Sequence, residues 1–125
     1  MNYTLSKNER LHSKKSIKEL FDKGSSFFLY PFKVLYFENP QNPIETNQVL
    51  FSVSKRKIKK AVDRNHVKRR IKEAYRLNKH LLTDKNKCKK NIAFIYVSSD
   101  ISTFKSIEPV IQKILKKLDH FSSES

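Results

Sequence analysis

Near its beginning the chain changes from a polar lead-in to hydrophobic residues at helical spacing. Residues 1–12 are mostly polar, with Leu5 and Leu11 as the apolar positions that could anchor them, and we expect an irregular segment. From Ser13 onward, hydrophobic residues at positions i, i+3 and i+4 predict a first helix. These residues are Ile17, Leu20 and Phe21.

Two features indicate where this helix begins and ends. Ser16 and Glu19 have the spacing of a capping box, in which the two side chains satisfy backbone N–H groups of the first turn. Gly24, the only glycine in the chain, stands just past the hydrophobic pattern. Because glycine adopts the left-handed conformation without steric cost, we expect Gly24 to close the helix in that conformation.

The middle of the chain has the residue types of β-strands. Phe27 to Glu38 is rich in aromatic and β-branched residues and predicts a strand, interrupted at Pro31 because proline cannot donate to a strand ladder. Val49 to Ser54 and Asn91 to Ser98 predict two further strands, whose apolar residues indicate that both faces are covered. Asn39 to Asn47 contains prolines and asparagines and predicts a loop.

The last third of the chain returns to helical spacing. A helix is expected to begin at Ser102 or Thr103, with Pro109 tolerated because it stands near the start. Its hydrophobic stripe, which we expect in the core, consists of Ile107, Val110, Ile111, Ile114, Leu115 and Leu118. Residues 122–125 are expected to fray.

Positive charge is abundant and concentrated in one segment. The chain has 125 residues, enough for one domain, and 27 lysines and arginines against 12 acidic residues give a net charge of +15. Residues 55–90 contain 16 lysines and arginines and three acidic residues, so 16 minus 3 gives +13 of that total. This concentration indicates a polyanionic partner, for which a phosphate backbone is the obvious candidate.

Within this segment, a helical pattern free of glycine and proline predicts a basic helix from about Lys60 to Leu82. Placing residues at about 100° per step separates two faces. The packing face contains Val67, Ile71, Ala74, Leu81 and Leu82, with Tyr75 and Asn78 near its edge. The opposite face contains Asn65, Lys68, Arg69, Lys72, Arg76 and Lys79, while Arg64 and Arg70 flank the packing face.

A charged helix face alone is weak evidence for binding, because most such faces are only solvated. Here, however, the cations stand mostly three or four residues apart with no acidic partner among them, and they repel one another unless phosphates or counter-ions bind. Arginine adds forked donors that suit phosphate oxygens. Asn65 could contact a ribose hydroxyl or a base edge. We therefore interpret this face as an RNA-binding surface.

Other classes of protein are disfavoured. No apolar run approaches the roughly 20 residues that span a bilayer, and the polar N-terminus has no signal-peptide core, so we expect a cytoplasmic protein. Cys88 has no second thiol or nearby histidine with which to bind zinc, and we interpret it as an incidental thiol. Binding to a membrane surface or in a calmodulin-like mode would require the packing face to be free.

The same segment resembles the signature of the bacterial ribonuclease P protein component. The matching residues are Ser52-Val53-Ser54-Lys55, then Ala61-Val62, then Arg64-Asn65-His66-Val67-Lys68-Arg69-Arg70-Ile71-Lys72-Glu73-Ala74. Further matches in order and spacing are Arg10-Leu11, Ile17, Leu20-Phe21 and Gly24. The resemblance therefore spans most of the chain.

The resemblance implies a fold and a function. The expected fold is α/β, a single-domain α+β sandwich over residues 1–125. It has a small central sheet of about four strands, three helices, and the basic helix on a left-handed βαβ crossover. The implied function is that of the protein subunit that binds the catalytic ribonuclease P RNA and the 5′ leader of precursor tRNA. The RNA, holding Mg²⁺, would perform the hydrolysis, so no catalytic residue, metal site or cofactor is expected in this chain.

The resemblance also implies which residues contact RNA. Arg64, Asn65, Lys68 and Arg69 would bind the RNA subunit, with Lys55 at the adjacent strand end. Together with the charge pattern, it gives an expected RNA-binding set of Lys55, Arg56, Lys57, Lys60, Arg64, Asn65, His66, Lys68, Arg69, Lys72 and Arg76. A cleft between the first helix and the sheet would hold the leader, with Ile17, Phe21 and Tyr36 at the matching positions. Ile17 and Phe21 could instead be core residues, because they also have helical spacing.

Two positions depart from the family pattern. His66 stands where the family has the second arginine of an Arg-Asn-Arg triplet, and a neutral imidazole lacks the fixed charge of a guanidinium group. Lys59-Lys60 stands where the turn before the basic helix usually carries Gly-Asn, with one extra residue nearby. We expect a slightly different turn and an additional phosphate contact.

Two alternatives remain open. A free-standing RNA-binding or ribosomal-type protein would use the same basic face only structurally. A protein-only nuclease would need catalytic residues, but the four histidines are scattered and no two-metal carboxylate cluster is evident in the sequence. We therefore disfavour the second alternative.

Overall fold

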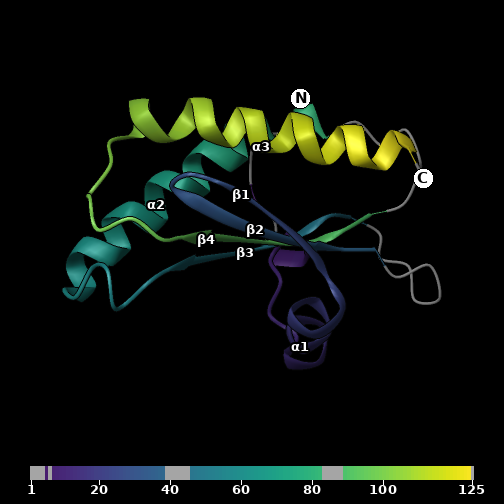
Figure 1. Cartoon of the computed structure of the whole chain (residues 1–125), viewed down its shortest axis with the longest axis horizontal. Helices are drawn as coiled ribbons and strands as arrows, with labels where there is room; N and C mark the ends of the chain where they lie inside the picture. Colours follow the sequence, from purple (N-terminus) through teal and green to yellow (C-terminus); the bar gives the residue numbers. More distant parts are fainter. Residues whose placement is uncertain (1–4, 6, 39–45, 83–88, 125) are drawn as a thin grey trace.

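The chain forms a four-stranded sheet with helices on both faces (Figure 1). The computed structural model describes residues 5, 7–38, 46–82 and 89–124. The helices are α1 (Lys14–Lys23), α2 (Ala61–Asn78) and α3 (Phe104–Glu124), with short 3-10 turns η1 (Lys7–Glu9) and η2 (Lys79–Leu81). The strands are β1 (Ser25–Leu29), β2 (Phe32–Phe37), β3 (Gln48–Val53) and β4 (Asn91–Tyr96). The predicted loop at Asn39–Asn47 lies mostly outside the described residues, and Cys88 lies outside them.

The sheet has the strand order β1-β2-β4-β3. β1 pairs antiparallel with β2, β2 pairs antiparallel with β4, and β3 pairs parallel with β4. The interruption expected at Pro31 is confirmed, but the segment forms two strands rather than one, because Pro31 lies in the turn of the β1–β2 hairpin. A parallel pair needs a crossover, and α2 supplies it between β3 and β4.

The two faces of the sheet are covered differently (Figure 1). One face carries Phe32, Val34 and Phe94, which are fully buried in the main hydrophobic cluster with residues of α2 and α3. The other face carries Leu35 and Ala93, which pack in a smaller cluster around Leu20 of α1 and Leu11. β4 is thus buried on both faces, as its sequence indicated.

The ends of α1 differ from the prediction. Ser13, not Ser16, caps the helix, because its Oγ accepts a hydrogen bond from the backbone N–H of Ser16 at 3.3 Å. Gly24 has φ −69° and ψ 157°, an extended conformation, so the expected left-handed closure is wrong. The glycine is explained by close approach instead: a Cβ there would lie 2.4 Å from the Leu20 carbonyl oxygen and 3.0 Å from that of Tyr36.

Both ends of the chain have more structure than expected. Arg10 forms a parallel bridge with Val49 of β3, and the backbone N–H of buried Leu11 donates to the Val49 carbonyl at 2.8 Å. This contact covers the free edge of β3 in part, as edge strands require. At the other end, α3 continues to Glu124, so residues 122–124 of the tail expected to fray are helical.

Candidate nucleic-acid interface

α2 is packed along one side and open along the other. Its buried residues are Val67, Ile71, Ala74, Tyr75 and Asn78, the side that the sequence pattern predicted. The Tyr75 ring lies 5.8 Å from that of Phe51 on β3 and 5.7 Å from that of Phe94 on β4. These contacts fix the rotation of the helix on the sheet, and its opposite face is left exposed.

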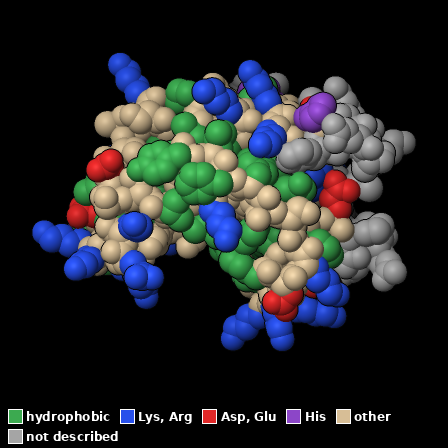
Figure 2. Space-filling view, in the orientation of Figure 1, with side chains coloured by type: hydrophobic (Ala, Val, Ile, Leu, Met, Phe, Trp, Pro, Cys, Tyr) green, Lys and Arg blue, Asp and Glu red, His purple; other side chains and the backbone are tan. Residues whose placement is uncertain are grey.

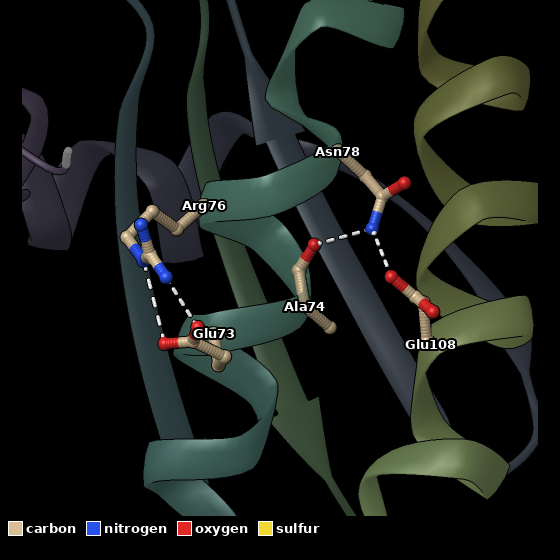
Figure 3. Close-up of polar contacts among 5 residues, drawn as sticks. All are labelled: Glu73, Ala74, Arg76, Asn78 and Glu108. Atoms are coloured by element: carbon tan, nitrogen blue, oxygen red, sulfur yellow. Dashed lines mark hydrogen bonds and ion pairs between the residues drawn. The ribbon is translucent and has the colours of Figure 1, made fainter. Parts of the chain in front are cut away.

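A polar network joins α2 to α3 at the C-terminal end of α2 (Figure 3). The Nδ2 of Asn78 donates to the Ala74 carbonyl at 2.8 Å and to Glu108 Oε2 of α3 at 2.9 Å. Gln112 Nε2 donates to Asn78 Oδ1 at 3.0 Å. The buried amide thus has partners for its donor and acceptor groups, and it supports the scaffold rather than the exposed face.

The segment before α2 is held in place by an arginine of the helix itself. The Nη1 of Arg64 donates to the carbonyl oxygens of Ile58 at 2.9 Å and Lys59 at 2.7 Å. Ile58 is buried in the main core and anchors the same segment from the other side. No side-chain hydrogen bond caps the helix at Lys60, so Arg64 has a structural role that its predicted RNA contact did not include.

The most open cations lie in the middle of α2. Lys68 and Arg69 are exposed and Lys72 is half-buried. The side chains of these three residues have no hydrogen bond or ion pair with another residue in the described part of the chain. Asn65 and His66 are exposed one turn earlier on the same helix. Arg69, His66 and Arg70 line a shallow hollow of about 210 Å³.

Two cations of the predicted face have acidic partners. Arg76 pairs with Glu73 one turn earlier on α2 (Figure 3), and the Nζ of Lys79 lies 2.8 Å from a carboxylate oxygen of Glu9. Acidic residues outside the predicted face therefore neutralise part of its charge at the C-terminal end of α2. Glu73 was visible at i,i+3 spacing, whereas Glu9 reaches Lys79 only through the tertiary fold.

Arg70 is also engaged by the fold. Its Nη1 donates to the Ser102 carbonyl at 2.8 Å and so ties α2 to the segment before α3. The cations left open thus lie in the first two thirds of α2 and in the segment that leads into it. Lys55, Arg56, Lys57, Lys59 and Lys60 of that segment are all exposed.

Arg10 joins this surface from the N-terminal segment. With Arg69, Lys72, Glu73, Arg76 and Leu5 it lines a pocket of about 360 Å³. A second pocket of about 310 Å³ lies between Arg10, Lys68 and Lys72, with Leu50 and Phe51 of β3 among its lining residues. The sequence contained Arg10 only as a family match, and nothing local indicated that it meets α2.

Only some of the residues predicted for the leader cleft lie on the same face of the sheet. Ile17 is half-buried and packs against the smaller cluster on the α1 side of the sheet, while Phe21 is 51% exposed. Tyr36 lies on the opposite face, where it packs on the main core with its ring 6.0 Å from that of Phe27. Its inclusion with Ile17 is therefore wrong, because successive strand residues alternate between faces. Leu35 and Phe37 share the face of α1 instead.

Metal-binding and membrane-spanning features are not found where the structure can be described. Within residues 7–38, 46–82 and 89–124, no three histidine, cysteine, aspartate or glutamate side chains gather as metal ligands would. No helix in the described part of the chain is long and apolar enough to cross a membrane.

Comparisons with known proteins agree with the geometry. The family described as Ribonuclease P matches residues 5–119. The ribonuclease P protein component of Porphyromonas gingivalis is 39% identical over 119 residues, which cover 93% of this chain and 87% of that protein. The ribonuclease P protein component of Clostridioides difficile is 40% identical over 103 residues, which cover 82% of this chain and 84% of that protein.

The fold is also similar to that of solved ribonuclease P proteins. The RNase P protein of Staphylococcus aureus superposes with a TM-score of 0.72 at 25% identity, covering 88% of this chain and 94% of that one. The superposition covers most of both chains, so this chain shares the overall α/β fold of that protein. The chain belongs to the ribonuclease P protein family, whose known role is the maturation of the 5′ end of tRNA.

Proposed function

We propose that this chain acts in the cytoplasm as the non-catalytic subunit of a ribonuclease P whose RNA carries out the hydrolysis. A ribonuclease P protein component implies a ribonuclease P RNA as its partner. In this proposal the open face of α2 and the segment 55–60 bind that RNA. The Mg²⁺ ions are held by the RNA, and the protein contributes binding and positioning.

The observation that carries the proposal is the row of open cations on α2. Lys68, Arg69 and Lys72 have no acidic partner among the described residues, although other cations of the same helix do. Keeping like charges close together lowers stability unless an anion is bound between them. Binding to phosphates releases counter-ions from the RNA and turns this repulsion into affinity. Arg10 extends the same surface beyond the helix.

We further propose that the α1 side of the sheet binds the 5′ leader of precursor tRNA. Phe21 is exposed on α1, and Ile17, Leu35 and Phe37 belong to the apolar cluster between α1 and the sheet. Apolar and aromatic walls suit single-stranded RNA of any sequence, because every base has a face that can stack. This assignment replaces Tyr36 with the residues that share the face of α1.

Cleavage of a precursor tRNA by a bacterial ribonuclease P RNA at low Mg²⁺, with and without this chain, tests the proposal. We expect the protein to stimulate cleavage, since added cations reduce the electrostatic cost of bringing two RNAs together. A free-standing RNA-binding protein would bind RNA without stimulating cleavage. Cleavage by the purified protein without RNA would show instead that the chain itself is a nuclease.

A further inference from the structure

Two aromatic side chains stand exposed on the β1–β2 hairpin. Phe28 is 59% exposed and Tyr30 is 61% exposed, and neither belongs to the two hydrophobic clusters. Their ring centroids lie 6.3 Å apart with 53° between the planes. Figure 2 shows hydrophobic side chains gathered over this hairpin with lysine and arginine side chains around them. A grouped apolar surface of this kind indicates a binding partner.

The strand register places Phe28 on the α1 side of the sheet. Phe28 pairs with Lys33 across the hairpin, and Lys33 pairs with Ile95 of β4. Directly paired residues point to the same face, so these three side chains form one row. The adjacent row contains Leu35 and Ala93, which pack in the cluster around α1. The exposed row therefore continues the α1-side surface toward the hairpin turn.

Polar groups border the two rings. The Tyr30 hydroxyl donates to Ser98 Oγ at 3.1 Å, which holds the ring in place. The Lys33 side chain is exposed and has no hydrogen bond or ion pair with any other residue that the structure describes. Asp100 is exposed close to the tyrosine end, since its backbone N–H donates to the same Ser98 Oγ. Negative phosphates are thus favoured at the lysine end of the row.

On the other face of β1, a lysine of α3 also approaches the strand. The Lys117 ammonium nitrogen lies 4.7 Å from the centroid of the Phe27 ring. β1 is an edge strand that carries the exposed ring of Phe28, with that of Tyr30 in the turn that follows it. A lysine lies near each of its faces, Lys33 of β2 on one and Lys117 of α3 on the other. Rings that alternate with cations are the surface on which single-stranded nucleic acid stacks.

We propose that Phe28, Tyr30 and Lys33 form a stacking platform for the part of the precursor-tRNA leader that extends beyond α1. The proposal rests on the leader binding proposed above and adds a second contact to it. Bases would stack on the two rings while the phosphates lie at Lys33. A second copy of the chain is a poorer occupant, because each copy carries a net charge of +15 and the patch is bordered by lysines.

The test measures the affinity of the holoenzyme, assembled from this chain and a bacterial ribonuclease P RNA, for three substrates. These are mature tRNA, a precursor with a leader of a few nucleotides, and a precursor whose leader is several nucleotides longer. For the wild type we expect a gain in affinity at each step. Combined Phe28→Ala and Tyr30→Ala substitutions should remove only the second gain, lowering affinity for the long leader at least about fivefold.

Matched variants separate stacking from general effects. Phe28→Trp keeps an aromatic face and should retain the second gain. Lys33→Ala should reduce it, whereas Lys105→Ala, which removes an exposed lysine at the start of α3, should leave it unchanged. Both rings are mostly in solvent, so circular dichroism should show a normally folded double variant.

Each other outcome overturns the platform in a distinguishable way. If the double variant keeps the second gain, the leader binds near α1 and the platform is wrong. If the wild type shows the first gain and no second one, the platform is also wrong while leader binding stands. If neither gain is seen, leader binding fails as well. A dimer in sedimentation that the double variant abolishes would assign the patch to a second copy.

Discussion

Arg64 and Lys68 lie one turn apart on α2 and have different surroundings. The guanidinium group of Arg64 is hydrogen bonded to two carbonyl oxygens of the segment before the helix, whereas the ammonium group of Lys68 has no partner among the described residues. Both were predicted RNA contacts. Only Lys68 is free to give its whole charge to a phosphate, so the two residues should respond differently to substitution.

Arg64→Ala should lower the free energy of unfolding by about 1–2 kcal/mol, because the Ile58 and Lys59 carbonyls lose their donor. Arg69→Ala, which removes an exposed arginine of the same helix, should change it by less than about 0.5 kcal/mol. Urea unfolding of the protein without RNA measures both. Equal stability of the two variants would show that the two hydrogen bonds of Arg64 do not support the fold.

Lys68→Ala should weaken binding to the ribonuclease P RNA and leave the stability of the protein unchanged. Loss of one phosphate contact should flatten the slope of log affinity against log salt by about 0.7–0.9. Titrations at several salt concentrations measure this slope. Lys113→Ala, on the exposed side of α3, is the control and should keep the wild-type slope. An unchanged slope for Lys68→Ala would place the RNA elsewhere.

At the scale of elements, the junction between α1 and β1 depends on a close approach of backbones. Gly24 was expected to end α1 in the left-handed conformation, but its φ of −69° is open to any residue. The position excludes side chains because the Leu20 and Tyr36 carbonyl oxygens crowd it. The sequence thus indicated that glycine matters here and gave the wrong physical reason.

Gly24→Ala should therefore destabilise the protein by about 2 kcal/mol, because the added Cβ would lie 2.4 Å from the Leu20 carbonyl oxygen and the backbone must shift. Left-handed strain would not contribute. Thermal or urea unfolding measures the loss, with Ser25→Ala at the next, exposed position as the control. If Gly24→Ala were as stable as the wild type, the junction would have room that the structure does not show.

The sequence of the basic helix predicted which face packs, but it did not predict which distant residues contact the exposed face. Hydrophobic periodicity correctly separated its packing face from its exposed face, since burial of Val67, Ile71 and Ala74 follows from their spacing. The neutralisation of Lys79 by Glu9 did not follow, because these residues are 70 positions apart in sequence. Helix periodicity describes one element and contains no information about what approaches it.

At the scale of the whole molecule, a buried ion pair joins the ends of two central strands. The Nζ of Lys90, just before β4, lies 2.6 Å from a carboxylate oxygen of Glu38, just after β2. The Lys90 side chain is 3% exposed and that of Glu38 is 26% exposed. Lys90 belonged to the basic segment in the sequence. In the fold its side chain is buried against Glu38, so its charge does not contribute to the exposed RNA-binding surface.

Glu38→Gln should lower the free energy of unfolding by about 2–3 kcal/mol, because it removes the carboxylate charge that lies 2.6 Å from the buried Lys90 ammonium group. Lys90→Met, which removes the buried charge itself, should cost less. Comparison of the two variants by urea unfolding tests this order. RNA affinity should be the same for both folded variants, and a loss of affinity specific to Lys90→Met would return Lys90 to the RNA-binding surface.

The sequence by itself determined the helices and the strands apart from the hairpin, and it located the concentration of cations in the basic helix and the segment before it. Each of these follows from spacing and residue type within a few consecutive positions. The sequence also identified the family, because the motif around Arg64 to Ala74 is contiguous and specific. None of these conclusions required a contact between distant residues.

Only the tertiary structure decided which charges remain open and which side chains share a surface. It paired Arg76 and Lys79 with acids, brought Arg10 to α2, and placed Tyr36 on the face away from α1. It also aligned Phe28 with Lys33 beside the α1 surface. Strand register and helix docking govern these relations, and because a shift of one residue moves a side chain to the opposite face, local sequence patterns cannot settle them.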